Sequence, residues 1–529
     1  MREKIIRALF LVIGIISLVP GVAYSGQWAI VYGSGSESWT GGLDPVTSGG
    51  GYYLYGSKTT AAGGADAVFG LLNSKGAVTW AKEIGPGTDA TDYLNVQVAP
   101  GGFLVDGSEA PVAPGSVGSA IWAKFDNSWN QVYAYSFGGL ENEVWISVTG
   151  NFSDTTDNGL IYTGSLVTGQ DTETACSDIF IFKTNSAGSI VWKNELQYKC
   201  EDQAYQALEV SDGYLIVGTL MDPSANASSL LLMKYSKTGK RSWAKAYSVA
   251  NESLTGGNLR RLSDGNFLLS GGMTDPTAPL VDGKILLAKV DSAGRIQWQN
   301  SYGISGLTLT PLNAIESASD KSIIISGSTF SSLYNANTVL IKVKSANGAL
   351  VKGVKIGASS ENDSDTVTES SSGDLLISGS HSISPGKATI FFGKVDKTTL
   401  EPVWTKAFAG GAYGKGMLIE TATGFLLSGS YGKNFSEEDI FGMLLDRSGN
   451  SNNCKISPLA LQTTSPVIHA ATKLTVSKPS FKTGANETIK PNPISLPVKT
   501  LSVPSAPICP HISALPTGRE DAMDISCGD

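Results

Sequence analysis

One short phrase recurs along this chain at a nearly fixed interval. A tryptophan follows a turn and opens a short alternating strand, as in GAVTWAKEIG and GRIQWQNSYG. The phrase returns at steps of 52, 53, 59, 51, 55, 54, 52 and 49 residues, which gives eight units. Tyr133 and Lys352 hold the anchor position in two degenerate copies, and the last copy decays at Asn453. The tryptophan anchors are Trp28, Trp80, Trp192, Trp243, Trp298 and Trp404.

Each unit carries two further strand signatures. An apolar strand ending in glycine and a small polar residue lies about halfway, such as GYYLYGS at 51–57 or GDLLISGS at 373–380. A third apolar strand closes on a turn such as NSAG or DSAG, where glycine suits a left-handed backbone. Period-2 alternation without helical periodicity predicts three or four antiparallel strands per unit. Eight small sheets bury their faces by packing radially, so we expect an all-β, eight-bladed β-propeller over residues 26–454, with the anchors between blades.

The repeat resembles that of a known group. The G-x-x-x-W turn with a following Gly-ending strand is similar to the tryptophan-containing repeat of quinoprotein-like eight-bladed propellers and of secreted bacterial propellers, over residues 28–450. The resemblance implies the fold, while such repeats serve enzymes, outer-membrane assembly factors and surface proteins alike. The quinoprotein dehydrogenases of the group use adjacent cysteines, calcium and a catalytic Asp. This chain has no adjacent cysteines, which argues against that cofactor.

The first residues are typical of an export signal. An apolar run at residues 8–19 follows three basic residues, is too short to span a bilayer, and is followed by small residues before Gly26. We expect residues 1–25 to be cleaved, leaving an exported chain, periplasmic, cell-surface or extracellular, without a membrane span. The net charge is −8, and no basic cluster occurs, which argues against nucleic acid as a partner.

The composition changes abruptly after Cys454. Residues 455–529 hold 10 of the 22 prolines but only 3 of the 61 glycines. They carry seven basic and five acidic residues, whereas residues 26–454 carry 29 basic and 41 acidic residues. Proline-rich segments favour extended chain over a packed core. We interpret residues 455–529 as a tail or docking strap that either folds back on its own blades or reaches a partner.

Five cysteines in an exported chain predict disulfides with one thiol left over. Cys176 and Cys200 flank one strand-turn-strand passage, which favours a bond between them, with free thiols as the alternative. Two of Cys454, Cys509 and Cys527 could tether the tail, and the third is then free or intermolecular.

Few residues carry recognisable catalytic chemistry. Only three histidines occur, two of them in the tail, which leaves histidine catalysis and zinc sites short of ligands. Acidic groups occur at Asp154 and Asp157, at 362–365 and at 437–439, where calcium binding or glycoside hydrolysis is conceivable, but solvated loops explain them better. We assign no catalytic, cofactor-binding or metal-binding residue, and calcium binding at 362–365 is the alternative.

Aromatic residues outside the repeat register concentrate in the first three units. They could line a carbohydrate- or protein-binding face, although core packing is favoured for most of them. The sequence favours an exported, non-enzymatic propeller that serves as a protein- or glycan-interaction platform. The alternatives are a propeller enzyme acting on glycans or a quinoprotein-type oxidoreductase, and a structural component of an extracellular assembly. The aromatic residues are Trp39, Trp122, Trp129, Trp145, Tyr52, Tyr53 and Tyr133.

Overall fold

The computed structural model describes residues 27–507 with gaps. Outside the described residues lie 1–26, 34–37, 47–49, 60–64, 86–89, 112–117, 142–143, 170–176, 199–200, 223–226, 279–281, 331–335, 358–361, 385–386, 409–412, 433–437, 453, 455, 460–461, 465–467, 474, 478–481, 484–491, 494–497, 501–504 and 508–529. Every regular element among the described residues is a β-strand. The described part of the chain accordingly contains no helix of the length and apolarity that crossing a membrane requires.

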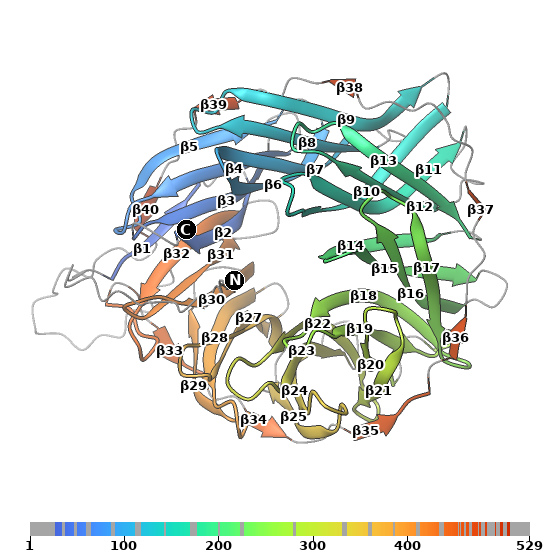
Figure 1. Cartoon of the computed structure of the whole chain (residues 1–529). Coiled ribbons are helices and arrows are strands. Elements are labelled where there is room, and N and C mark those ends of the chain that lie inside the picture. Colours follow the sequence, from blue (N-terminus) through green and yellow to red (C-terminus); the bar gives the residue numbers. More distant parts are fainter. Residues whose placement is uncertain are drawn as a thin grey trace, which may run out of the picture.

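Eight four-stranded blades surround a central opening, so the predicted eight-bladed, all-β propeller is confirmed (Figure 1). The first strand of each blade lies nearest the centre and the fourth lies at the rim. Within a blade, neighbouring strands pair antiparallel in chain order, as in β14-β15-β16-β17. The predicted three or four strands per unit are therefore four.

The strand bounds of the first four blades are as follows. Blade 1 contains β2 (Trp39–Pro45), β3 (Tyr52–Thr59), β4 (Ala65–Leu72) and β5 (Val78–Ile84). Blade 2 contains β6 (Ala90–Ala99), β7 (Gly102–Pro111), β8 (Ser119–Asp126) and β9 (Gln131–Glu141). Blade 3 contains β10 (Val144–Asp154), β11 (Leu160–Gly169), β12 (Ser177–Thr184) and β13 (Ile190–Gln197). Blade 4 contains β14 (Gln203–Val210), β15 (Gly213–Asp222), β16 (Ala227–Ser236) and β17 (Arg241–Ser248).

The other four blades continue the series. Blade 5 contains β18 (Ser253–Arg261), β19 (Phe267–Thr274), β20 (Lys284–Val290) and β21 (Ile296–Gly303). Blade 6 contains β22 (Thr308–Glu316), β23 (Ile323–Phe330), β24 (Ala336–Val343) and β25 (Leu350–Gly357). Blade 7 contains β26 (Asn362–Glu369), β27 (Leu375–Ser384), β28 (Lys387–Val395) and β29 (Pro402–Phe408). Blade 8 contains β30 (Tyr413–Glu420), β31 (Phe425–Gly432), β32 (Glu438–Leu445) and β1 (Ala29–Tyr32).

Blade 8 closes the ring with a strand from the other end of the chain. The N-terminal β1 pairs antiparallel with β32, with Val31 opposite Phe441. Closing the ring in this way joins the first and last units through backbone hydrogen bonds. Opening it would expose both blade faces that meet there.

Buried apolar side chains form clusters between successive blades. One cluster combines Leu215 and Leu232 of blade 4 with Leu269 and Leu286 of blade 5. Equivalent clusters occupy the other seven boundaries among the described residues. The stability of each blade therefore depends on both neighbours, as expected for a repeat architecture.

The C-terminal tail returns along the rim of the ring. Eight short strands follow one another from blade 7 back to blade 1 and then reach blade 8, and each pairs with the fourth strand of one blade (Figure 1). The sequence left open whether the tail folds back or reaches a partner, and these strands lie on its own blades. They are β33 (Ile456–Pro458), β34 (Gln462–Thr464), β35 (Ile468–Ala471), β36 (Thr475–Ser477), β37 (Lys482–Thr483), β38 (Asn492–Pro493), β39 (Val498–Thr500) and β40 (Ser505–Pro507).

Cys454, at the junction of propeller and tail, is disulfide-bonded. The other four cysteines lie outside the described residues. The pairing of Cys176 with Cys200 therefore stays a prediction, as does the export signal at residues 1–25.

Candidate ligand-binding surface

Anchor side chains pack against a turn of the next blade. A Cβ on Gly239 would lie 2.5 Å from the Trp192 ring, and a Cβ on Gly348 would lie 2.5 Å from Trp298. These glycines have φ of +80° and +66°, a backbone conformation that side chains penalise. Glycine recurs at this turn because a side chain would clash with the anchor ring of the preceding blade and would disfavour the left-handed backbone. The same contact joins Trp28 to Gly76, Tyr133 to Gly188, Trp243 to Gly294 and Trp404 to Gly449.

A second contact crosses blade boundaries nearer the centre. A glutamate near the end of a first strand accepts hydrogen bonds from the turn after the first strand of the preceding blade. Glu316 Oε2 accepts from the Ser263 amide at 2.6 Å, and its Oε1 accepts from the Ser263 hydroxyl at 2.9 Å. Equivalent bonds join Glu209 to Thr156, Glu369 to Ala318 and Ser317, and Glu420 to Ser371.

Two of these carboxylates, Glu209 and Glu420, are held in the charged form. Burial would raise the pKa of Glu209, but hydrogen bonds from Lys237 and Thr156 hold it below its usual value. Burial would likewise raise the pKa of Glu420, but hydrogen bonds from Ser371 and Arg447 hold it below its usual value. The contacts of these two glutamates are therefore charge-assisted hydrogen bonds, which are stronger than neutral ones.

The boundary between blades 1 and 2 lacks both contacts. Val98 stands opposite Phe103 in the ladder, which is the position that Glu209 holds opposite Tyr214 in blade 4. Trp129 occupies the turn position that glycine holds in six other blades, and it keeps the left-handed φ of +64°. Non-glycine residues avoid this conformation unless the surroundings impose it. Two repeat positions thus depart from the pattern at one boundary, and both carry apolar side chains.

The rings at this boundary form a continuous cluster. Trp129 stacks on Phe103, with centroids 4.2 Å apart and planes at 10°, and meets Trp80 edge-on at 5.8 Å. Phe69 joins these rings and stacks against Tyr53 at 5.4 Å. We call Tyr53, Trp80, Val98, Phe103 and Trp129 the aromatic surface.

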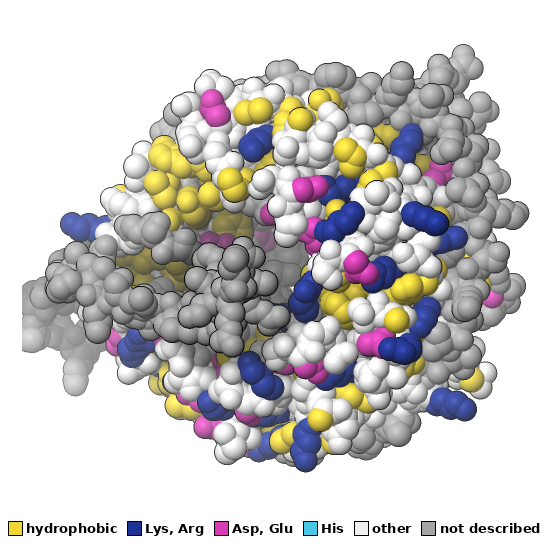
Figure 2. Space-filling view, viewed as in Figure 1, with side chains coloured by type: hydrophobic (Ala, Val, Ile, Leu, Met, Phe, Trp, Pro, Cys, Tyr) yellow, Lys and Arg dark blue, Asp and Glu magenta, His cyan; other side chains and the backbone are white. Residues whose placement is uncertain are grey.

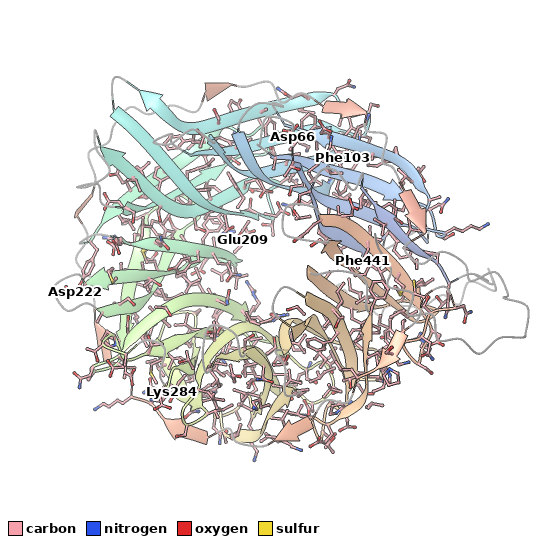
Figure 3. All side chains as sticks on the ribbon, turned by 180° about the vertical axis from the view of Figure 1, so that it is seen from behind. Asp66, Phe103, Glu209, Asp222, Lys284 and Phe441 are labelled. Atoms are coloured by element: carbon pink, nitrogen blue, oxygen red, sulfur yellow. The ribbon has the colours of Figure 1, made fainter. Side chains whose placement is uncertain are left out.

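The aromatic surface reaches solvent. Val98 is 55% exposed, Tyr53, Trp80 and Trp129 are half-buried, and Phe103 is buried. Figure 2 shows hydrophobic side chains gathered at the upper left, over the blade of β4 and β5, whereas acidic and basic side chains alternate to the right of the centre. In Figure 3, Phe103 lies among the strands of blades 1 and 2, and Glu209 lies near the centre of the ring.

Polar groups border the aromatic surface on the far side of blade 2. The Gln97 amide donates to Asp106 at 3.1 Å and to Asp154 at 3.3 Å, which joins blade 2 to blade 3. Burial raises the pKa of Asp106 to about 7, opposed by the Gln97 hydrogen bond and reinforced by the Asp154 charge. Partial desolvation by neighbouring groups also raises the pKa of Asp154, although this residue keeps contact with solvent. Because consecutive side chains of a strand point to opposite faces, Gln97 faces blade 3, whereas Phe103 and its ladder partner Val98 face blade 1.

The other residues singled out from the sequence have different places. Trp122 is fully buried and donates its indole N–H to the Gly188 carbonyl at 2.8 Å, so it is a core residue. Asp157 forms an ion pair with buried Lys183 at 2.9 Å, a structural role within blade 3. Tyr52 and Tyr133 are buried. The side chains of Trp39, Trp145 and residues 362–365 lie outside the described ones.

Sequence reasoning found Trp129 and Tyr53 but missed Val98, Phe103 and Gln97. The missed signal was a register comparison, because Val98 is conspicuous only when the ends of the first strands are aligned across blades. Among the described residues, no three His, Cys, Asp or Glu side chains gather closely enough to hold a metal ion.

Comparisons with known proteins add the following findings. No protein family and no curated protein matches this chain. A quinohemoprotein alcohol dehydrogenase from Comamonas testosteroni is 9% identical, with a TM-score of 0.42 over 80% of this chain and 77% of that one. A Dyadobacter fermentans protein of unknown function is 11% identical, with a TM-score of 0.33 over 56% and 93%. Drosophila Semaphorin 2a is 7% identical, with a TM-score of 0.34 over 66% and 73%.

Proposed function

We propose that this chain is an exported interaction platform that binds a carbohydrate at the aromatic surface. The observation that carries the proposal is Trp129, which holds a strained backbone in a glycine position and stacks on Phe103. A residue kept in a costly conformation is a reason to look for function at that place. Export, predicted from residues 1–25, is part of the proposal.

The chemistry of the surface favours a sugar. Aromatic rings have electron-rich faces that attract the C–H groups of a pyranose ring. Gln97 and Asp154, on the blade 3 side of blade 2, supply an amide and a carboxylate that can hydrogen-bond hydroxyl groups of a sugar chain extending from the aromatic surface across this blade. A purely apolar surface would fit a protein partner better, because it offers no groups for hydroxyls.

Two substitutions that restore the repeat test the proposal. Trp129→Gly supplies the residue that the backbone prefers, and Val98→Glu supplies the residue that blades 4, 6, 7 and 8 carry at this position, so both chains should fold. We expect affinity for soluble polysaccharides to fall at least tenfold in each. The measurement is affinity electrophoresis in gels containing neutral hexose, N-acetylhexosamine or uronic acid polymers, followed by calorimetry on the polymer that retards the wild type.

Val351→Glu is the matched control. Val351 is 48% exposed in blade 6, far from the aromatic surface in the ring, so this change adds the same charge without affecting binding. If no polymer retards the wild-type chain, or if Trp129→Gly binds as tightly as the wild type, the carbohydrate proposal fails. Crosslinking to a protein that Trp129→Gly abolishes would instead make the surface a protein-binding one.

A further inference from the structure

The tail strands cover one particular part of each outer edge. In blade 5, β35 pairs with residues 300–303, which begin two positions after Trp298. In blade 4, β36 pairs with residues 246–248, which begin three positions after Trp243. In blade 7, β33 pairs with residues 406–408, two positions after Trp404. The tail therefore adds a fifth strand to the second half of the fourth strand.

The first half of the same edge is irregular. In blade 3 the ladder pairs Lys183 with Trp192 and Thr184 with Ile190, so Val191 has no partner and forms a bulge. The bulge lies immediately before the anchor position in six other blades as well, at Thr79, Val132, Ser242, Gln297, Val351 and Val403. Bulges twist an edge and hinder strand addition. Bulge and tail strand together leave little regular edge open in these blades.

Ring closure depends on the same arrangement. The tail strand β40 pairs with β1, placing Ala506 opposite Val31. The N-terminal strand therefore lies between β32 and β40 instead of at an open edge. Detaching β40 would leave a four-residue closing strand held on one side only.

Charge favours the contact between tail and ring. Residues 455–507 contain six lysines and one acidic residue, Glu487, whereas residues 26–454 carry 29 basic and 41 acidic residues. Opposite net charges attract a tethered segment from any starting position. Short strands of two to four residues can then form individually along the rim.

We propose that the C-terminal tail is a protective belt, which occupies the outer edges of the eight blades so that strands of a second copy of this chain cannot add there. An uncovered edge strand is a template for any extended chain. Eight equivalent edges on one molecule would make such association multivalent. This inference is independent of carbohydrate binding.

Proline substitutions in the full chain test the belt. Thr464→Pro, Ala470→Pro and Ser477→Pro together remove three backbone donors from β34, β35 and β36, at residues that pair with Lys355, Ser301 and Ala246. The matched control carries Thr464→Val, Ala470→Val and Ser477→Thr, which keep strand propensity. We expect the proline chain to form oligomers in light scattering as its concentration rises, and its outer strands in blades 4 to 6 to exchange amide hydrogens at least tenfold faster.

A synthetic peptide covering residues 455–507 shows whether the proline substitutions only uncover the outer edges or unfold the propeller. Added in excess, it should return the proline chain to monomer and restore slow exchange, which it could not do for an unfolded ring. Unchanged exchange would mean that the tail does not cover these edges, and faster exchange without oligomers would mean that the cover does not prevent association. Either result overturns the inference. The polysaccharide binding of the proline chain is measured separately. If this binding is retained while the belt inference fails, the proposed carbohydrate-binding function still stands.

Discussion

The boundary between blades 1 and 2 and the boundary between blades 5 and 6 have the same backbone but different side chains. Between blades 5 and 6, Gly348 admits Trp298, and Glu316 bonds to the Ser263 turn. Between blades 1 and 2, Trp129 and Val98 replace these residues, and an aromatic surface results. A propeller tolerates this exchange because each boundary is buried by its own cluster of apolar side chains.

Comparing all boundaries shows which of the two recurring contacts each boundary keeps. The boundary of blades 6 and 7 keeps the glutamate contact, from Glu369, although Leu400 stands in the turn of blade 7. The boundary of blades 8 and 1 keeps the glycine contact, at Gly76. Each recurring contact is thus absent from at least one boundary, and among the described residues only the boundary of blades 1 and 2 lacks both.

The charged side of the ring also has a surface hollow. A cavity of about 680 Å³ between blades 5 and 6 is lined in part by Lys289 and Lys342. Lys342 pairs with Asp320 at 2.7 Å, and Lys289 pairs with Asp264. Because these charges are satisfied within the protein, we assign the hollow no ligand.

The largest expected effect comes from placing a side chain in a normal turn. Gly348→Ala should lower the free energy of unfolding by about 2 to 4 kcal/mol, because the new Cβ meets Asn300 and Trp298 and the backbone is left-handed. Urea denaturation followed by circular dichroism measures the change. A loss below about 0.5 kcal/mol would show that this turn position accepts a side chain at little cost. The backbone of Trp129 would then be no evidence of function.

The second effect concerns the buried carboxyl group of Asp106, which bonds to Gln97 in blade 2. The folded pKa of Asp106, about 7, exceeds its unfolded value, so the folded state favours the proton and stability falls as pH rises from about 4 to about 7. Asp106→Asn should therefore raise stability at pH 8 by about 2 kcal/mol and leave it nearly unchanged at pH 4. Unfolding curves at both pH values test this, and equal effects at both would contradict the assignment.

The third effect has the opposite dependence on pH. The folded pKa of Glu209 is lowered, so its contribution is present above its unfolded pKa and is lost as pH falls through the folded value. Glu209→Gln should cost about 1 kcal/mol at pH 7 and little at pH 3. Differential scanning calorimetry at the two values is the check. High salt should reduce the difference, and no salt effect would argue against a charge-assisted contact.

The smallest effect is expected at the exceptional turn. Trp129→Gly removes ring contacts but relieves the left-handed strain, so we expect a net loss of about 1 kcal/mol or less. A loss of about 3 to 5 kcal/mol, as for a fully buried tryptophan, would make Trp129 a core residue. Thermal unfolding of the variant, run beside Gly348→Ala, decides between the two interpretations.

Particular residues show how far the sequence reaches. Trp192 with Gly239 and Trp298 with Gly348 are local signals that recur, so the blade count followed from their spacing. Trp122 and Trp129 looked alike in sequence, since both lie outside the register. Trp122 is in the core, where it packs against Phe182, and Trp129 is half-buried, where it stacks on Phe103. Both phenylalanines lie tens of residues away on other strands, so the sequence did not distinguish the two tryptophans.

The sequence by itself determined the strands, the turns and the number of blades, because alternation and turn glycine act within a few residues. Only the tertiary structure decided which aromatic residues gather between blades 1 and 2, and that the tail lies along the rim. The tail strands pair through backbone groups with strands up to 477 positions away, as Pro507 does with Ile30 at the closing blade. Backbone hydrogen bonds are the same for nearly every residue, so such a pairing leaves little mark on the sequence.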